Sequence, residues 1–194
     1  MIKKIEEQVV NYLLPEEALS LDELEICLYG LNMIIKKAYH IVFILGLGFI
    51  LGEFCGTLLF LVIYAQIREY SGGYHADSST GCYCCTIIAT VCAIALIKVL
   101  PQINLYWSLG CMLICGGIIW GVSPQEAENK PLMEMEKRKY QYVTRKYLLI
   151  SGGICVFGGI CPLIMYSVVT AWTIQAIMLG AGKLKSTCKR RKRI

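Results

Sequence analysis

Residues 68–82 read REYSGGYHADSSTGC and form the one polar, glycine-broken interval in the apolar middle of the chain. Apolar runs precede and follow this interval, so its position decides how the chain is threaded. It contains His75 and Cys82, seven positions apart. A thiolate is a strong nucleophile once a neighbouring imidazole takes the thiol proton. The interval is therefore the first candidate for chemistry, and we interpret the rest of the chain as its scaffold.

The composition is that of a membrane protein. Of the 194 residues, 56% are hydrophobic and 17% are charged, and the mean hydropathy is +0.57. A soluble domain has a charged share of about a quarter. Several apolar runs reach the roughly 20 residues that cross a hydrocarbon core. We therefore predict an all-α membrane protein with one membrane domain, and no cleavable signal peptide in the charged first twenty residues.

The amino-terminal region, residues 1–37, has the pattern of interfacial amphipathic helices. In residues 2–13 the apolar side chains fall on one helical face, which predicts a short helix on the membrane surface. Pro15 ends it. A second helix begins at Ser20, which forms a capping box with Glu23, and an apolar stripe follows at steps of three and four.

Residues 38–182 form the predicted membrane domain. The apolar run 38–67 is too long for one untilted span and slightly short for two, but its glycines suggest a tight reversal near 52–53. The clearer spans are 82–100, 103–121, 147–161 and 163–182. If 38–67 is a hairpin, the chain has six transmembrane helices arranged as three hairpins.

Positive charge decides between one span and two in 38–67. With a hairpin there, all Lys and Arg residues except Lys98 lie on one side of the membrane. The positive-inside tendency then places both termini and the loops 68–81 and 122–146 in the cytoplasm. Residues 183–194 form a basic cytoplasmic tail, for which attraction to anionic lipid headgroups is a sufficient explanation. No aromatic-interleaved basic surface accompanies the tail, so we expect no nucleic-acid binding.

Most of the eleven cysteines lie in apolar runs, where cysteine behaves as a small hydrophobe. Cys82 differs because it begins the third span, where free N–H groups and the helix dipole favour a thiolate. Gly73, with Gly72, lets the backbone turn toward His75. Asp77, Ser79 or a backbone carbonyl could orient His75. A zinc site of His75 with Cys82 and the neighbouring cysteines is an alternative that crowds its ligands at one helix start, so we predict no metal and no cofactor.

At this point the chain resembles a known family. The pattern R-x3-GG-x-HA-x-SS-x2-C over residues 68–82 is similar to the active-site signature of the accessory gene regulator B (AgrB) family. These are membrane cysteine endopeptidases that process autoinducing-peptide precursors in Gram-positive quorum sensing. A second match is Pro124, followed by NKPL at 129–132 and a basic run through Arg138 and Lys139. Length, order of motifs and six-span topology agree with the family over nearly the whole chain.

The resemblance implies a role for each candidate residue. Cys82 would be the nucleophile and His75 its general base, cutting an AgrD-like precursor through an acyl-enzyme thioester that cyclises to a thiolactone or lactone. Basic residues would attract the acidic end of the precursor: Arg68, Lys130, Lys137, Arg138 and Lys139. The resemblance also implies a homodimer in the cell membrane of a Gram-positive bacterium, with a cytoplasm-facing active site. The alternative function is a non-catalytic small peptide transporter or membrane scaffold.

Overall fold

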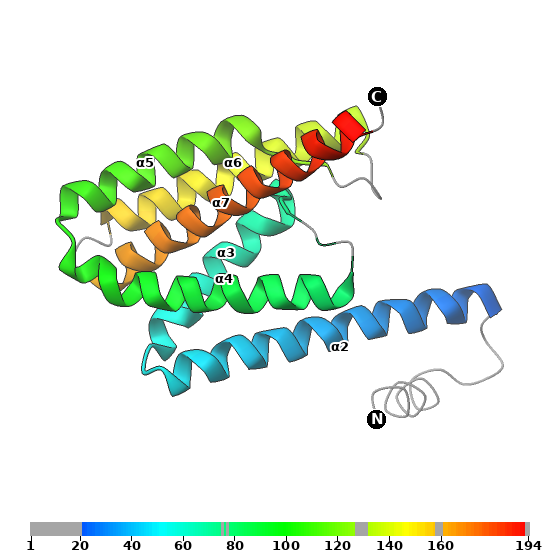
Figure 1. Cartoon of the computed structure of the whole chain (residues 1–194), viewed down its shortest axis with the longest axis horizontal. Coiled ribbons are helices and arrows are strands. Elements are labelled where there is room, and N and C mark those ends of the chain that lie inside the picture. Colours follow the sequence, from blue (N-terminus) through cyan, green and yellow to red (C-terminus); the bar gives the residue numbers. More distant parts are fainter. Residues whose placement is uncertain (1–20, 75, 77, 127–131, 158–160, 193–194) are drawn as a thin grey trace. The chain divides into compact units, whose positions relative to one another are not determined.

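The computed structural model describes residues 21–74, 76, 78–126, 132–157 and 161–192 (Figure 1). Within these ranges the regular structure is entirely helical. The chain divides into two units, Met1–Gly46 and Leu47–Ile194, and each is described by itself.

Helix α2, Leu21–Ile50, makes up the described part of the first unit and ends inside the second. It joins the predicted amphipathic stripe and the first predicted span into one continuous helix. The predicted helix 2–13 and the capping residue Ser20 lie outside the described residues.

The predicted break near residues 52–53 is confirmed. Helix α2 ends at Ile50 and α3 runs Phe54–Ser71. Gly52 has a φ of +76°, which favours glycine, and the amide of Glu53 donates to the carbonyl of Gly48 at 2.8 Å. A Cβ atom at Gly48 would lie 2.6 Å from Thr57 Oγ1, so the small residue permits the close return of the chain.

The middle of the second unit contains α4 (Ser79–Val99), the 3₁₀ helix η1 (Leu100–Gln102) and α5 (Leu105–Val122). Pro101 lies within the 3₁₀ turn that separates the two long helices. The side chain of Asn104 then caps α5 by accepting a hydrogen bond from the amide of Tyr106 at 3.0 Å. These bounds agree closely with the predicted spans 82–100 and 103–121.

The last two helices are longer than the predicted spans. Helix α6 runs Glu134–Phe157, and its first turn carries Glu134 and Glu136, which suit the positive end of the helix dipole. Helix α7 runs Pro162–Lys192. Proline at the first position starts α7 without losing a hydrogen bond. Lysine and arginine are good helix formers and favourable at a carboxyl end, so α7 continues into the predicted tail.

Four described helices are long and apolar enough to cross a membrane: Glu25–Ile50, Gly81–Gln102, Leu105–Val122 and Pro162–Cys188. Helices α3 and α6 lie where the second and fifth spans were predicted, but their charged ends make them less apolar. The arrangement of six spans as hairpins, the cytoplasmic termini and the domain division stay predictions.

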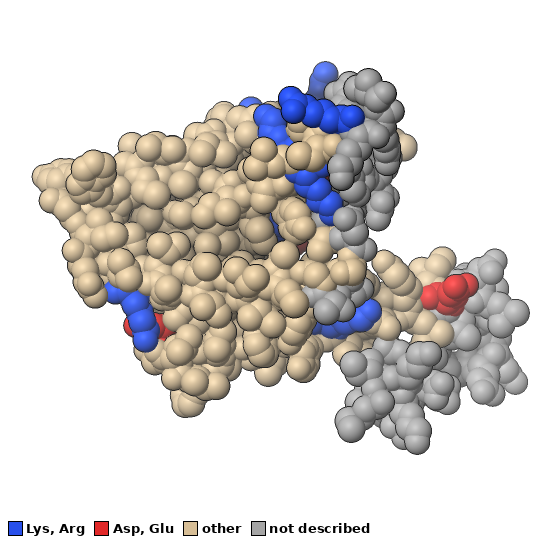
Figure 2. Space-filling view, viewed as in Figure 1, with Lys and Arg blue, Asp and Glu red and all other residues tan. Residues whose placement is uncertain are grey.

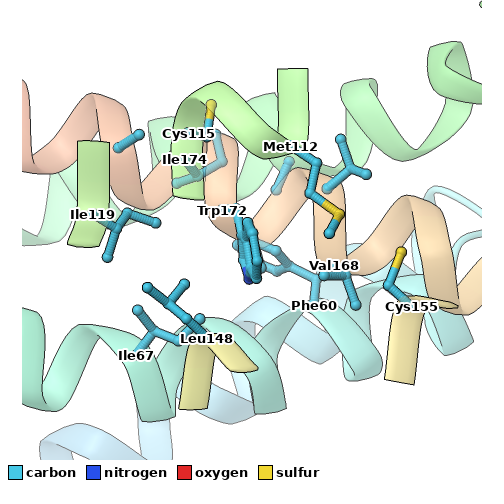
Figure 3. Close-up of a cluster of buried hydrophobic side chains, with 14 of the residues drawn as sticks. Phe60, Ile67, Met112, Cys115, Ile119, Leu148, Cys155, Val168, Trp172 and Ile174 are labelled. Atoms are coloured by element: carbon cyan, nitrogen blue, oxygen red, sulfur yellow. The ribbon is translucent and has the colours of Figure 1, made fainter. Parts of the chain in front are cut away.

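Helix α7 organises the core of the second unit, where it contacts α3, α4, α5 and α6. At the centre is Trp172, which is 6% exposed and lies among Phe60, Met112 and Val168 (Figure 3). Its indole N–H donates to Ser151 Oγ at 3.1 Å, because a buried indole needs a partner. The core therefore fixes α7 firmly against its neighbours.

Candidate functional site

Cys82 lies in the first turn of α4 and its side chain is exposed. Ser78 caps this helix: its hydroxyl accepts from the amide of Gly81 at 3.0 Å, and its carbonyl accepts from the amide of Cys82. The thiol is thus in the first turn of a helix, close to its amino terminus, as predicted.

Several predicted site residues lie outside the described part of the chain. These are His75, Asp77 and Lys130. Ser79 is the first residue of α4, but its side chain is also outside the description. The predicted pairing of His75 with Cys82 and the group that orients His75 therefore stay predictions.

The glycine pair that precedes His75 turns the backbone as predicted. Gly72 has a φ of +72° and Gly73 a φ of +132°, conformations that side-chain-bearing residues rarely adopt. The surroundings also require glycine. A Cβ atom at Gly72 would overlap the carbonyl oxygen of Gln125, and a Cβ atom at Gly73 would overlap Arg68 Nη1.

Arg68 binds the loop that follows its own helix. Its Nη1 donates to the carbonyl of Gly72 at 2.6 Å and its Nη2 to the carbonyl of Tyr74 at 2.5 Å. A planar guanidinium suits two acceptors at once. The described contacts of Arg68 therefore hold residues 72–74, and its predicted contact with substrate stays a prediction.

Two further segments hold the same loop. The amide of Tyr74 donates to the carbonyl of Met178 on α7, and the amide of Gln125 donates to the carbonyl of Ser71, both at 2.9 Å. Gly182 lets the loop lie against α7, since a Cβ atom there would be 2.8 Å from the amide nitrogen of Tyr74. Residues 71–74 are fixed from three directions.

The predicted basic residues after Lys130 lie at the start of α6. Figure 2 shows Lys and Arg side chains gathered where α6 begins and α7 ends. Arg138 and Lys139 are exposed. Lys137 Nζ pairs with Glu126 Oε1 at 2.5 Å and with Glu134 Oε1 at 3.5 Å. The hydrogen bond and charge of Glu126 raise the pKa of Lys137.

Within the described residues, no group of three or more His, Cys, Asp or Glu side chains is placed to hold a metal ion. The zinc alternative includes His75, which lies outside them.

Sequence reasoning missed Gln175, whose side chain is fully buried on α7. Its Nε2 donates to Ser71 Oγ at 2.6 Å and to the carbonyl of Gly72 at 2.9 Å. A lone amide inside the apolar run 163–182 is a signal that could have found it, because polar residues inside spans are often functional. Gln125 and Met178 hold residues 71–74 through backbone atoms, so their side chains give no such signal in the sequence.

Comparison with known proteins supports the resemblance. A family model described as Accessory gene regulator B matches residues 6–180. The chain belongs to the accessory gene regulator B family. Membership in this AgrB family supports a role in accessory gene regulation and autoinducer processing. The apolar helices and the AgrB family together fit a multi-pass membrane protein.

Individual AgrB relatives are similar over most of their length. Putative AgrB-like protein 2 of Clostridium perfringens (strain 13) is 28% identical over 145 residues, covering 72% of this chain and 68% of the relative. Putative AgrB-like protein of Clostridium perfringens (strain SM101) is 26% identical over 162 residues, covering 80% and 74%. Accessory gene regulator protein B of Staphylococcus aureus (strain MRSA252) is 25% identical over 130 residues, covering 62% and 66%. No solved structure matches this AgrB chain with significant similarity.

Proposed function

We propose that this chain is a membrane cysteine endopeptidase that cleaves an AgrD-type precursor peptide and promotes its cyclisation. The observation that carries the proposal is an exposed thiol, Cys82, in the first turn of α4. It follows a loop that Arg68, Gln125 and α7 fix immediately before His75. Nucleophile and base need such fixed supports, because catalysis depends on their relative position.

In the proposed reaction, His75 takes the proton of the Cys82 thiol. The thiolate adds to a peptide carbonyl of the precursor, and His75 then gives the proton to the departing amine as the C–N bond breaks. The product is a thioester between the precursor and Cys82, together with a free carboxy-terminal fragment. Free N–H groups at the start of α4 are candidates to stabilise the oxyanion.

The thioester retains acyl-transfer potential that hydrolysis would lose. A thiol or hydroxyl within the same peptide attacks the thioester carbonyl, which forms the ring, and Cys82 leaves as a thiolate that regains its proton. Holding the internal nucleophile nearby raises its effective concentration. Exclusion of water favours cyclisation over hydrolysis.

The basic residues at the start of α6 would attract the acidic end of the precursor by charge complementarity. Arg138 and Lys139 are exposed, which supports this part of the proposal. Lys137 is less available because Glu126 and Glu134 already pair with it. Lys130 is part of the same proposal through its place in the NKPL motif.

The test is co-expression with the cognate precursor, followed by mass analysis of the peptides. Cys82→Ala and His75→Ala should each abolish cleavage, and Cys82→Ser should nearly do so because a hydroxyl is a far weaker nucleophile. Cys84→Ala is the matched control, since Cys84 is an exposed cysteine two positions away. Continued cleavage by Cys82→Ala, or export of intact precursor by the wild type, would contradict the proposal.

A further inference from the structure

Gln175 is an amide in the apolar core of the second unit. Its side chain is 0% exposed, and its neighbours Ile174 and Ala176 are buried apolar residues. Burial of an amide is unfavourable unless its polar atoms form hydrogen bonds. A residue of this kind in the middle of α7 therefore calls for an explanation beyond packing.

The hydrogen bonds of Gln175 reach across the fold to the start of the loop. Its Nε2 donates to the hydroxyl of Ser71, itself fully buried, at 2.6 Å and to the carbonyl of Gly72 at 2.9 Å. Both amide protons are thereby used. The contacts join residues separated by more than a hundred positions in the chain.

The carbonyl of Gly72 is held from two sides. It accepts from Gln175 and, at 2.6 Å, from Arg68 Nη1. One turn further along α7, the carbonyl of Met178 accepts from the amide of Tyr74. Helix α7 therefore holds the glycine turn at two points, and the second point is adjacent in the chain to His75.

We infer that Gln175 is a positioning residue for the cysteine protease reaction, an inference that rests on the proposed function. Glycine has a wide choice of backbone conformations, so Gly72 and Gly73 do not fix the direction of the chain by themselves. The Gln175 amide supplies part of that constraint from the rigid core. It acts through the backbone of residues 71–74 and needs no contact with substrate.

The first measurement compares Gln175→Met and Gln175→Leu with Thr170→Val. Both Gln175 variants have a side chain of comparable size that lacks the amide donor. Thr170 is the matched control, because it is buried on the same helix and its hydroxyl has no hydrogen-bond partner among the described residues. Turnover of the precursor per folded protein should fall about 10- to 100-fold in the Gln175 variants, the scale of a 1 Å misplacement, with KM little changed. Thr170→Val should cleave like the wild type.

The second measurement separates positioning from stability. The alkylation rate of Cys82 is followed against pH, using mass spectrometry of the peptide that contains it. In Gln175→Met the pH at half-maximal rate should move upward, because the thiol loses the support of a correctly placed base. Loss of stability alone would lower the yield of folded protein and leave this profile unchanged.

A double-mutant cycle with Ser71→Ala provides the third measurement. If the Gln175–Ser71 hydrogen bond carries the effect, the two substitutions should be non-additive in turnover. Wild-type turnover and an unchanged alkylation profile in Gln175→Met would overturn the inference, as would loss of activity in proportion to lost folded protein. If Cys82→Ala still cleaves, the proposed function fails, and the alkylation profile still reports whether Gln175 controls the thiol.

Discussion

Arg68 has two candidate roles, attraction of the substrate and attachment of the loop that follows α3. Its place at the end of α3 and its charge predicted a contact with the acidic end of the precursor. In the structure its guanidinium donates to the carbonyls of Gly72 and Tyr74. Holding the loop and attracting substrate make different demands on the side chain, because only the first requires a fork of donors.

Arg68→Lys separates these two demands. Lysine keeps the charge but cannot serve both carbonyls in the same geometry. We expect cleavage to fall by about 10- to 100-fold, the equivalent of a lost charge-assisted hydrogen bond of roughly 1.5–3 kcal/mol. The rate relative to wild type should be the same at low and high salt. Near-normal cleavage by Arg68→Lys would favour the substrate role instead.

Lys139→Gln is the comparison for a residue that acts by attraction alone. Lys139 is exposed at the start of α6. Its substitution should raise KM at low ionic strength with little change in kcat, and the difference should shrink as salt screens the charge.

The pairing of Lys137 with Glu126 predicts how fast the Lys137 amine reacts with an acylating reagent. Because the hydrogen bond and charge of Glu126 raise the pKa of Lys137, less of its amine is free at a given alkaline pH. We therefore expect Glu126→Gln to speed acylation of Lys137 at mildly alkaline pH, as read by peptide mass spectrometry. Lys98, on another helix, should react at an unchanged rate. Unchanged labelling of Lys137 would show that the pair with Glu126 does not lower the reactivity of this amine.

At the scale of helices, there is one glycine pair on α5, Gly116 and Gly117, and one on α6, Gly152 and Gly153. In each pair only the first member lies near the Trp172 ring. A Cβ atom at Gly116 would lie 2.5 Å from the Trp172 ring and one at Gly152 would lie 3.4 Å from it, whereas a Cβ atom at Gly117 or Gly153 would have no described residue within 4 Å. Gly116 therefore permits the close approach of α5 to α7, whereas a methyl group at Gly152 would make an ordinary van der Waals contact with the ring. Gly117 and Gly153 meet no such neighbour among the described residues, and the predicted homodimer stays a prediction.

Gly116→Ala and Gly117→Ala form a matched pair that tests this division. Gly116→Ala should destabilise the protein by about 1–3 kcal/mol, because the added methyl overpacks against a buried ring. Gly117→Ala should be neutral or slightly stabilising, since alanine is the better helix former. Thermal unfolding of the two variants in the same detergent, followed by tryptophan fluorescence, measures the difference. Equal stability of the two variants would show that the Trp172 ring can shift to accommodate the added methyl group.

Helix existence was predictable from the sequence, but two helix ends were not. Apolar run length and Pro101 predicted α4 and α5, because a span has a fixed length and proline interrupts a helix. The start of α6 and the end of α7 extend into charged sequence that carries no stop signal. Hydropathy predicts the part of a helix that lies in lipid, but it does not predict how far the same helix continues into water.

At the scale of the whole molecule, the sequence predicted the turn at Gly72 and Gly73 and a helix start close to Cys82, which the structure places three residues earlier, at Ser79. Both are local, and both have a residue-level cause. The attachment of the turn to Gln175 was not predictable, because it joins positions 103 residues apart and leaves no periodic pattern. Arg68 was singled out from its position in the sequence, but the carbonyls of Gly72 and Tyr74 that it binds could not be predicted from the sequence. Its predicted contact with substrate stays a prediction.

The threading of the chain through the membrane is open to a direct test. The charge distribution predicts that position 130 and the carboxyl end are both cytoplasmic. A reporter active only in the cytoplasm should therefore be active when fused after residue 130 and after residue 194. A control fusion after residue 102, at the predicted outer end of the third span, should be inactive. Activity of the 102 fusion, or its absence at 130, would overturn the six-span threading.

The unbroken course of α7 from Pro162 to Lys192 has a practical use. A membrane protein of 21.7 kDa is a difficult subject for single-particle electron microscopy because it offers little mass for alignment. A soluble helical protein spliced onto Lys192 without a linker would continue the same helix and so inherit the orientation of the core around Trp172. Such a rigid marker would let images be aligned on density outside the micelle while the thiol of Cys82 is left untouched.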